Sequence, residues 1–213
     1  MKLKKFLEEH NIEAVLISSK YSLRYFTGFT GTTGIALAFA EKRFFFTDFR
    51  YVTQAKKEVE PNGFTVVKVE RGAVDALAEY IKNSGIKKLG IEDKYVTLAE
   101  YVVYKEKFEE IGFVTLGEAL DKLRMIKTEE EIGYIKKAVE IGDKVFEYIL
   151  DKVKEGAVEK DLAAEMEFQM KKLGGEGPSF ETIIASNYRS ALPHGVASEK
   201  ALEKEGLVKF DFG

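Results

Sequence analysis

The chain has 213 residues, of which 45% are hydrophobic and 32% are charged, so it is long enough to bury a sizeable core and too apolar to be disordered. Its 33 basic and 36 acidic residues give a formal net charge of −3, which offers no basic surface for nucleic acid. The absence of cysteine excludes disulfides, zinc–thiolate sites, iron–sulfur clusters and a thiol nucleophile. No apolar stretch reaches the roughly 18 residues of a membrane span, and no signal-like segment opens the chain. We therefore expect a cytoplasmic protein that binds neither nucleic acid nor membrane.

Residues 1–120 alternate short apolar runs with amphipathic stretches, a pattern typical of an α/β domain with a mixed, centrally buried sheet. We predict strands at 14–18, 34–39, 44–47, 64–69 and 88–91, and helices at 2–10, 50–58, 74–83 and 98–109. Gly28, Gly31 and Gly34 mark turns, and Asn-Ser-Gly at 83–85 ends a helix. The spacing of these glycines is not that of a dinucleotide-binding loop, and the sequence contains no phosphate-binding loop, so nucleotide binding is disfavoured.

Residues 128–213 differ in character, because long helical periodicities replace the short alternation. Thr128 and Glu131 form a capping box that starts a long amphipathic helix, which we expect to stop at Gly156. The apolar residues expected on its core-facing side are Ile132, Ile135, Val139, Phe146, Ile149 and Val153. A helix at 159–173, a strand at 182–185, a polar loop at 186–196 and a final strand at 207–212 follow. We therefore expect two domains, at 1–120 and 128–213, joined by a linker at 121–127, the second with helices packed on an antiparallel sheet.

The two histidines differ in their surroundings. His10 follows two glutamates at the end of the first predicted helix, where a cation complements the last carbonyls, so a structural role explains it. His194 lies between Pro193 and Gly195, which hold an imidazole on a shaped loop after a strand. This pattern alone is compatible with a structural or a catalytic role.

Asp211 lies between two aromatic residues in the final predicted strand. Because side chains alternate along a strand, Phe210 and Phe212 face one side and the carboxylate faces the other. The pattern fits either a hydrogen-bonded or edge-exposed aspartate, or an oxygen ligand of a divalent metal. The strand ends the sequence with no element to complete its sheet, so we expect the second domain to be incomplete.

Taken together, these motifs resemble the prolidase and Xaa-Pro aminopeptidase family of metallopeptidases, family M24, whose catalytic domain has the pita-bread fold. The motifs in the second region are LRMIKTEEEI at 123–132, ETIIAS at 181–186, LPHG at 192–195 and FDFG at 210–213. In the first region they are LRYFTGF at 23–29 and TDFRY at 47–51. The resemblance covers the whole chain. It implies a creatinase-like N-terminal α/β domain with a mixed sheet, followed by the first half of an α+β pita-bread domain.

The resemblance also implies roles for individual residues. Asp211 would be the first of five ligands of two divalent metal ions, and His194 would lie beside them and contact substrate or transfer a proton. Phe180 would form a wall of the substrate pocket. Arg50 would bind substrate in the neighbouring subunit of a homodimer, although an exposed charge at a helix start also explains it.

The family's other four ligands would lie beyond Gly213. The resemblance therefore implies that the intact protein uses manganese, cobalt or zinc to hydrolyse the bond between an N-terminal residue and proline in a peptide, as a dipeptidase or an aminopeptidase. It also implies that this 213-residue chain alone is inactive and binds no stoichiometric metal. Two alternatives remain: a creatinase-like amidinohydrolase, and a non-catalytic pita-bread module that binds a partner. Retention of both the Pro-His-Gly loop and the Asp-Phe-Gly strand favours an enzyme.

Overall fold

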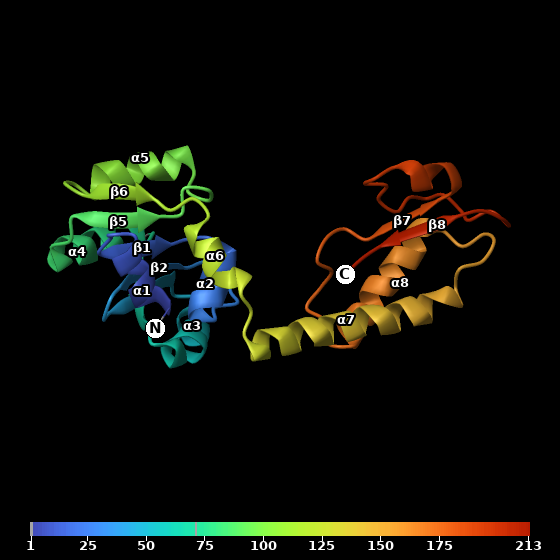
Figure 1. The fold of residues 1–213 in the computed structure, drawn as a ribbon, viewed down its shortest axis with the longest axis horizontal. Coiled ribbons are helices and arrows are strands. Elements are labelled where there is room, and N and C mark those ends of the chain that lie inside the picture. The colour runs from blue at the N-terminus through green and yellow to red at the C-terminus, as the bar shows by residue number, and fades with distance from the viewer. Residues whose placement is uncertain (1, 71) are drawn as a thin grey trace. The chain divides into compact units, whose positions relative to one another are not determined.

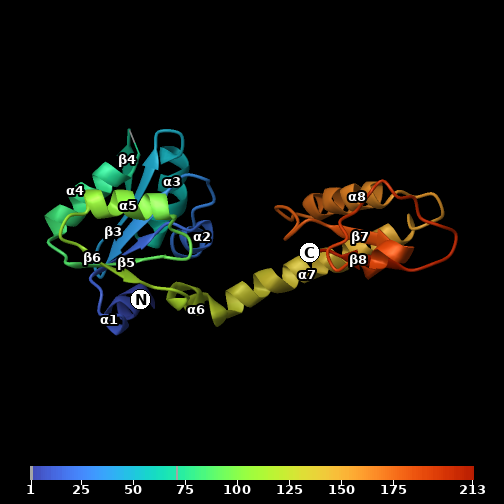
Figure 2. The same cartoon turned by 90° about the horizontal axis from the view of Figure 1, so that it is seen from above.

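The computed structural model describes residues 2–70 and 72–213 and divides the chain into two compact units, Met1–Ile126 and Lys127–Gly213. The secondary structure of each unit can be followed in Figures 1 and 2. The strands of the first unit are β1 (Ala14–Ile17), β2 (Ile35–Phe39), β3 (Arg43–Asp48), β4 (Thr65–Val69), β5 (Lys88–Ile91) and β6 (Gly112–Thr115). Its helices are α1 (Lys2–Glu9), α2 (Lys20–Thr27), α3 (Val52–Val59), the short 3-10 helix η1 (Glu60–Asn62), α4 (Val74–Ser84), α5 (Leu98–Lys107) and α6 (Ala119–Met125).

The strands of the first unit form one mixed sheet in the order β4-β3-β2-β1-β5-β6. Strand β2 runs antiparallel to its neighbours β1 and β3, whereas β3 and β4, β1 and β5, and β5 and β6 pair in parallel. The mixed, centrally buried sheet predicted from the sequence is confirmed.

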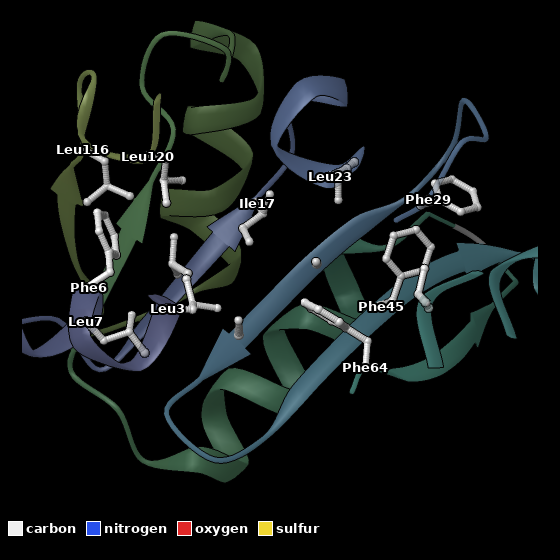
Figure 3. Packing of buried hydrophobic residues seen from close by; sticks show 14 of the residues in the cluster. Leu3, Phe6, Leu7, Ile17, Leu23, Phe29, Phe45, Phe64, Leu116 and Leu120 are labelled. Atoms are coloured by element: carbon white, nitrogen blue, oxygen red, sulfur yellow. The ribbon is translucent and has the colours of Figure 1, made fainter. Parts of the chain in front are cut away.

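Side chains alternate between the two faces of the sheet along each strand, and the side chains on both faces are apolar. Helices therefore cover both faces of this sheet. Val15, Ile17 and Phe45 face the layer formed by α1, α2, α3 and α6, and Figure 3 shows this core from close by. Leu16 and Phe46 face the opposite layer, which contains α4 and α5. The continuous apolar runs in the sequence therefore reflect strands that are buried on both sides.

Four elements of the first unit do not appear among the predicted ones: α2, η1, β6 and α6. Helix α6 occupies most of the stretch 121–127 that we expected to be a linker. Its Leu120 is buried in the first unit's core and Leu123 packs against that core, while the Tyr25 hydroxyl donates a hydrogen bond to the Leu123 carbonyl. The first unit thus extends to Ile126, because the motif that opens with Leu123 also supplies core contacts to the sheet.

The second unit contains α7 (Glu129–Leu150), α8 (Glu159–Lys172), β7 (Ile183–Ser186), the 3-10 helix η2 (Asn187–Ala191) and β8 (Val208–Asp211). Strands β7 and β8 pair antiparallel, with Ile183 opposite Asp211 and Ala185 opposite Lys209. The predicted helices packed on an antiparallel sheet are therefore present. Their shared core contains Val145, Ile149, Met166 and Ile184.

Helix α7 differs from the expectation in its length and in its buried face. It ends at Leu150 rather than near Gly156, and only its C-terminal half packs against the rest of its unit, through Val145 and Ile149. Ile135 and Val139, which we expected in the core, are 50% and 57% exposed. Although α7 has 22 residues, no helix in the described part of the chain combines the length and apolar character needed to cross a bilayer.

Candidate active site

The strand that carries Asp211 presents two chemically different faces. The rings of Phe210 and Phe212 lie on one face, each with its centroid 5.9 Å from that of Phe146 on α7. By the alternation of the strand, Lys209 and Asp211 belong to the other face, where Asp211 is exposed. The alternation predicted from the sequence is confirmed, and exposure leaves the Asp211 carboxylate in contact with solvent.

The loop that carries His194 lies over the same face of the β7–β8 sheet as Asp211. The Lys209 ammonium donates hydrogen bonds to the backbone carbonyls of Leu192 and Pro193, the second at 3.3 Å. Gly195 in the loop packs closely against Ala185 of the neighbouring strand β7. A Cβ placed on Gly195 would lie 3.2 Å from the Cβ of Ala185, so only glycine allows this approach without displacing the loop. Strand β8 therefore supplies both the carboxylate and the cation that holds the histidine loop.

Phe180 lies beside the carboxyl end of β8 without belonging to that strand. The Ser179 amide donates a 2.7 Å hydrogen bond to the carbonyl of Gly213, two residues after Asp211. A Cβ placed on Gly213 would lie 3.8 Å from the Phe180 ring, which is 45% exposed. The structure thus places Phe180, the His194 loop and Asp211 around one small sheet.

Arg50, the fourth candidate, belongs to the first unit and has a local partner. Its guanidinium donates to the Asp48 carboxylate in a bidentate arrangement, with Nε–Oδ1 and Nη2–Oδ2 distances of 3.0 and 2.7 Å. These hydrogen bonds hold the pKa of Asp48 below its ordinary value. This ion pair lies at the end of β3, whose last residue is Asp48, and gives the TDFRY motif a structural explanation within its own unit.

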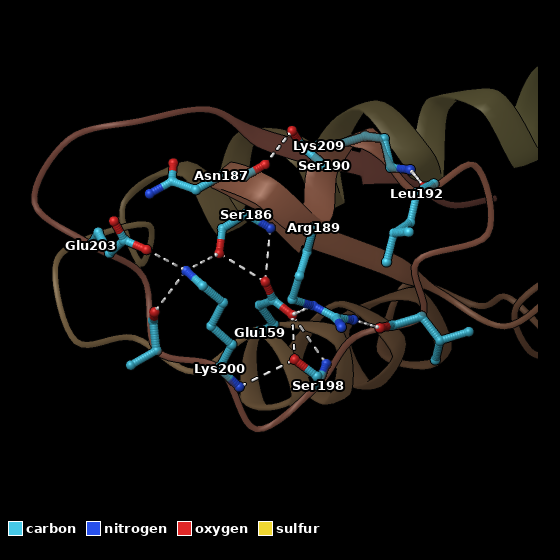
Figure 4. Close-up of polar contacts among 12 residues, drawn as sticks. Glu159, Ser186, Asn187, Arg189, Ser190, Leu192, Ser198, Lys200, Glu203 and Lys209 are labelled. Atoms are coloured by element: carbon cyan, nitrogen blue, oxygen red, sulfur yellow. Dashed lines mark hydrogen bonds and ion pairs between the residues drawn. The ribbon is translucent and has the colours of Figure 1, made fainter.

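A buried carboxylate that the sequence pattern did not predict lies beneath the histidine loop. Glu159, the first residue of α8, is fully buried and accepts hydrogen bonds from three residues of the segment 186–198 (Figure 4). Oε1 accepts from the amide and hydroxyl of Ser186 at 2.7 and 2.8 Å. Oε2 accepts from Arg189 Nε at 3.0 Å and from the amide and hydroxyl of Ser198 at 3.2 and 2.7 Å.

Burial pushes the pKa of Glu159 upward, but the hydrogen bonds from Ser198 and Ser186 outweigh burial, and its pKa lies below the ordinary value. The carboxylate is therefore ionised at neutral pH. An acidic residue in the first turn of a helix is common because it complements the helix dipole, so nothing in the sequence pattern indicates that this glutamate is buried.

Metal binding at this site depends on how many ligands converge there. A dinuclear centre requires several oxygen or nitrogen ligands that converge on the ions. No group of three or more histidine, aspartate or glutamate side chains converges in this way anywhere in the described residues, and Asp211 is one carboxylate. The residues that the structure describes do not by themselves fit such a centre.

Two cavities, of about 660 and 720 Å³, lie in the first unit. The first is bounded by the ends of α4 and α5, and the second by the hairpin between β2 and β3 together with α4. Neither is lined by any of the four candidate residues, so cavity size does not locate the candidate site.

Comparisons with known proteins place this geometry in a family. Residues 1–126 match the Creatinase/Prolidase N-terminal domain and residues 133–213 match Metallopeptidase family M24. The chain is 40% identical over 212 residues to the uncharacterized peptidase YqhT of Bacillus subtilis, covering all of this chain and 60% of that protein. It is 39% identical over 216 residues to the Xaa-Pro dipeptidase of Pyrococcus furiosus, covering all of this chain and 59% of that protein. The solved structure of an Xaa-Pro dipeptidase from Bacillus anthracis superimposes with a TM-score of 0.93 at 40% identity, covering all of this chain and 59% of that one.

The chain belongs to the family of proteins that combine a creatinase/prolidase N-terminal domain with an M24 metallopeptidase domain. This confirms the family resemblance and the fold class inferred from the motifs. The chain spans about 60% of the length of the curated relatives that it matches.

Proposed function

We propose that these 213 residues are part of an Xaa-Pro peptidase that hydrolyses the bond between an N-terminal residue and proline. The observation that carries the proposal is the pair of hydrogen bonds from the Lys209 ammonium to the backbone carbonyls of Leu192 and Pro193. These bonds hold the His194 loop over the face of β8 that bears Asp211. The Xaa-Pro dipeptidases among its relatives support proline-containing peptides as the substrate class.

In this proposal, each residue of the candidate site has a separate task. The exposed His194 imidazole contacts the peptide near the scissile bond and holds or transfers a proton there. The Phe180 ring offers an apolar wall for the proline ring or the neighbouring side chain. Asp211 would be one ligand of the metal, together with further ligands that the described residues do not supply. The metal, when bound, would supply the Lewis acidity of a metallopeptidase.

We further propose a cytoplasmic homodimer in which Arg50 contributes to the substrate site of the neighbouring subunit. A related structure is titled as the N-terminal domain of a cytoplasmic peptidase, PepQ, from Mycobacterium tuberculosis, at 31% identity over 58% of this chain. Because Arg50 is already paired with Asp48, its role in a neighbouring site would be to present an ordered guanidinium.

The test is a comparison of two histidine variants of the complete gene product, because the chain contains only two histidines. His194→Ala should lower kcat on an Xaa-Pro dipeptide by about 10²- to 10⁴-fold, the range for loss of a general acid or base, with bound metal unchanged. His10→Ala is the matched control, because His10 bonds the Phe6 carbonyl in the first unit and should leave kcat unchanged.

The outcome also separates the alternatives. Full activity of His194→Ala would remove the histidine from the mechanism. Absence of hydrolysis of every Xaa-Pro peptide would favour the binding module, whereas cleavage of creatine would favour the amidinohydrolase.

A further inference from the structure

The buried carboxylate of Glu159 contacts both ends of the loop 187–197, which carries His194. Ser186, its partner on Oε1, is the last residue of β7, where the loop begins. Ser198, its partner on Oε2, lies where the loop returns to α8. One carboxylate therefore fixes both ends of the segment that contains His194.

Arg189 connects the two sides of the loop through hydrogen bonds. Its Nε donates to Glu159 Oε2 at 3.0 Å, and its Nη2 donates to the carbonyl of Val196 at 2.6 Å. The arginine thus joins η2 on one side of the loop to the residues directly after His194 on the other. Since His194 is exposed and its ring has no hydrogen-bond partner among the residues that the structure describes, the conformation of the loop backbone decides where the imidazole is presented.

We propose that Glu159 is a positioning residue for His194: its carboxylate, by binding Ser186, Arg189 and Ser198 together, holds the loop 187–197 in the conformation that presents the imidazole. This inference rests on the function proposed for His194. Glu159 itself is fully buried and does not reach substrate, so it acts through the loop.

The chemistry requires a carboxylate at this position. The Oε2 atom accepts two N–H bonds, from Arg189 and from the Ser198 amide, and balances the charge of a largely buried guanidinium. Glutamine has the same shape but places an NH2 group, which cannot accept a hydrogen bond, at the position of one of the two carboxylate oxygens. The backbone bonds from Glu159 to Lys200 and from Lys160 to Ser198, both 3.0 Å, do not depend on the side chain. The Glu159→Gln variant should therefore fold and lose order in the loop.

The test measures loop order by NMR relaxation in the 213-residue chain. The amides of residues 190–196 should have order parameters of about 0.85 in the wild type and below about 0.6 in Glu159→Gln. The His194 Cε1–H signal should shift or broaden, while the signal of His10, in the other unit, stays unchanged. In the complete protein, the same variant should lower kcat by about 10- to 100-fold with KM nearly constant.

Two controls separate positioning from general loss of stability. Glu167→Gln removes a carboxylate of the same helix that binds Thr182 and not the loop. Met166→Ala destabilises the core of the same unit away from the loop. Both should leave the order of 190–196 at its wild-type value. If Glu159→Gln does not fold, Ser198→Ala removes the 2.7 Å hydroxyl bond to Glu159, together with the 3.2 Å bond that the same hydroxyl accepts from the Lys200 amide, and should lower the same order parameters by a smaller amount.

Unchanged loop order in Glu159→Gln, or in Ser198→Ala where it replaces that variant, would overturn the inference. A loop that loosens as expected, in a protein whose His194→Ala variant keeps full turnover, would instead refute the proposed function of His194 and leave the order of the loop explained. The two failures are therefore distinguishable.

Discussion

Replacing Glu159 with glutamine should destabilise the second unit strongly at neutral pH and hardly at all in acid. At neutral pH the variant keeps one acceptor oxygen and loses the other together with the negative charge, so either the Ser186 amide or the N–H groups of Arg189 and Ser198 lose their acceptor. Each hydrogen bond to a charged partner is worth about 1.5–3 kcal/mol. Breaking a buried ion pair from one side costs about 3–5 kcal/mol by mutational precedent. We therefore expect a loss of about 3–5 kcal/mol, a large part of the stability of a domain of this size, which is about 5–10 kcal/mol.

The pH dependence follows from the direction of the pKa shift. The pKa of Glu159 in the folded chain lies below the ordinary value of 4.5, so the folded state favours the ionised form. The stabilisation is complete above the unfolded pKa and is lost as the pH falls from about 4.5 through the folded pKa. The difference in the free energy of unfolding between wild type and variant should be constant from pH 7 to about pH 5.5 and should shrink below it.

The measurement is urea unfolding at several pH values, followed by the methyl NMR signals of Met166 and Met170. Both side chains are buried in the second unit, so they report on that unit alone, and the sequence contains no tryptophan to serve instead. A loss below about 1 kcal/mol at pH 7 would refute the argument, because it is less than one charged hydrogen bond. A difference that does not change with pH would equally refute it, because it would mean that the charge of Glu159 does not matter.

Three further predictions concern the fold. Trypsin under native conditions should cut first after the exposed Lys127, between α6 and α7, and mass spectrometry should find no early cut inside α6. Thr97→Ala should remove the capping box of α5 and cost the first unit about 1 kcal/mol in urea unfolding, whereas Thr53→Ala, on the exposed side of α3, should change it by less than about 0.5 kcal/mol. Gly195→Ala should destabilise the second unit by about 1–3 kcal/mol, because its neighbours at 3.2 and 3.3 Å have to move; a neutral effect would show that the loop is not held against β7.

The fold was largely predictable where hydrophobic periodicity and turn residues agree. Strand 88–91 was predicted at its observed bounds, and Gly85 ends α4 in the left-handed conformation that the Asn-Ser-Gly pattern indicates. Short or aromatic-rich elements were not predicted from the sequence. Helix α2 consists of KYSLRYFT and β6 of GFVT, which are too short to show a period. Helix α7 was found, but its apolar stripe does not reveal that only the C-terminal half packs within its unit.

The candidate site was predictable only in its most distinctive residues. Pro193, His194 and Gly195 form a recognisable loop, and Phe210, Asp211 and Phe212 have a strand alternation that the structure reproduces. Glu159 and Lys209 were not predictable, because a helix-start glutamate and a strand lysine are ordinary surface residues in a sequence. Their roles depend on contacts with residues far along the chain, which bring α8 and β8 to the same loop.

The most direct test of the proposed active site measures bound metal and proline release together in the complete gene product. Asp211→Asn should lower the bound divalent metal per chain and reduce proline release from an Xaa-Pro dipeptide by at least about a hundredfold. Asp161→Asn, an exposed aspartate on α8, is the matched control and should leave both quantities unchanged. Wild-type metal content together with wild-type proline release in Asp211→Asn would contradict the assignment of this face of β8 as the active site.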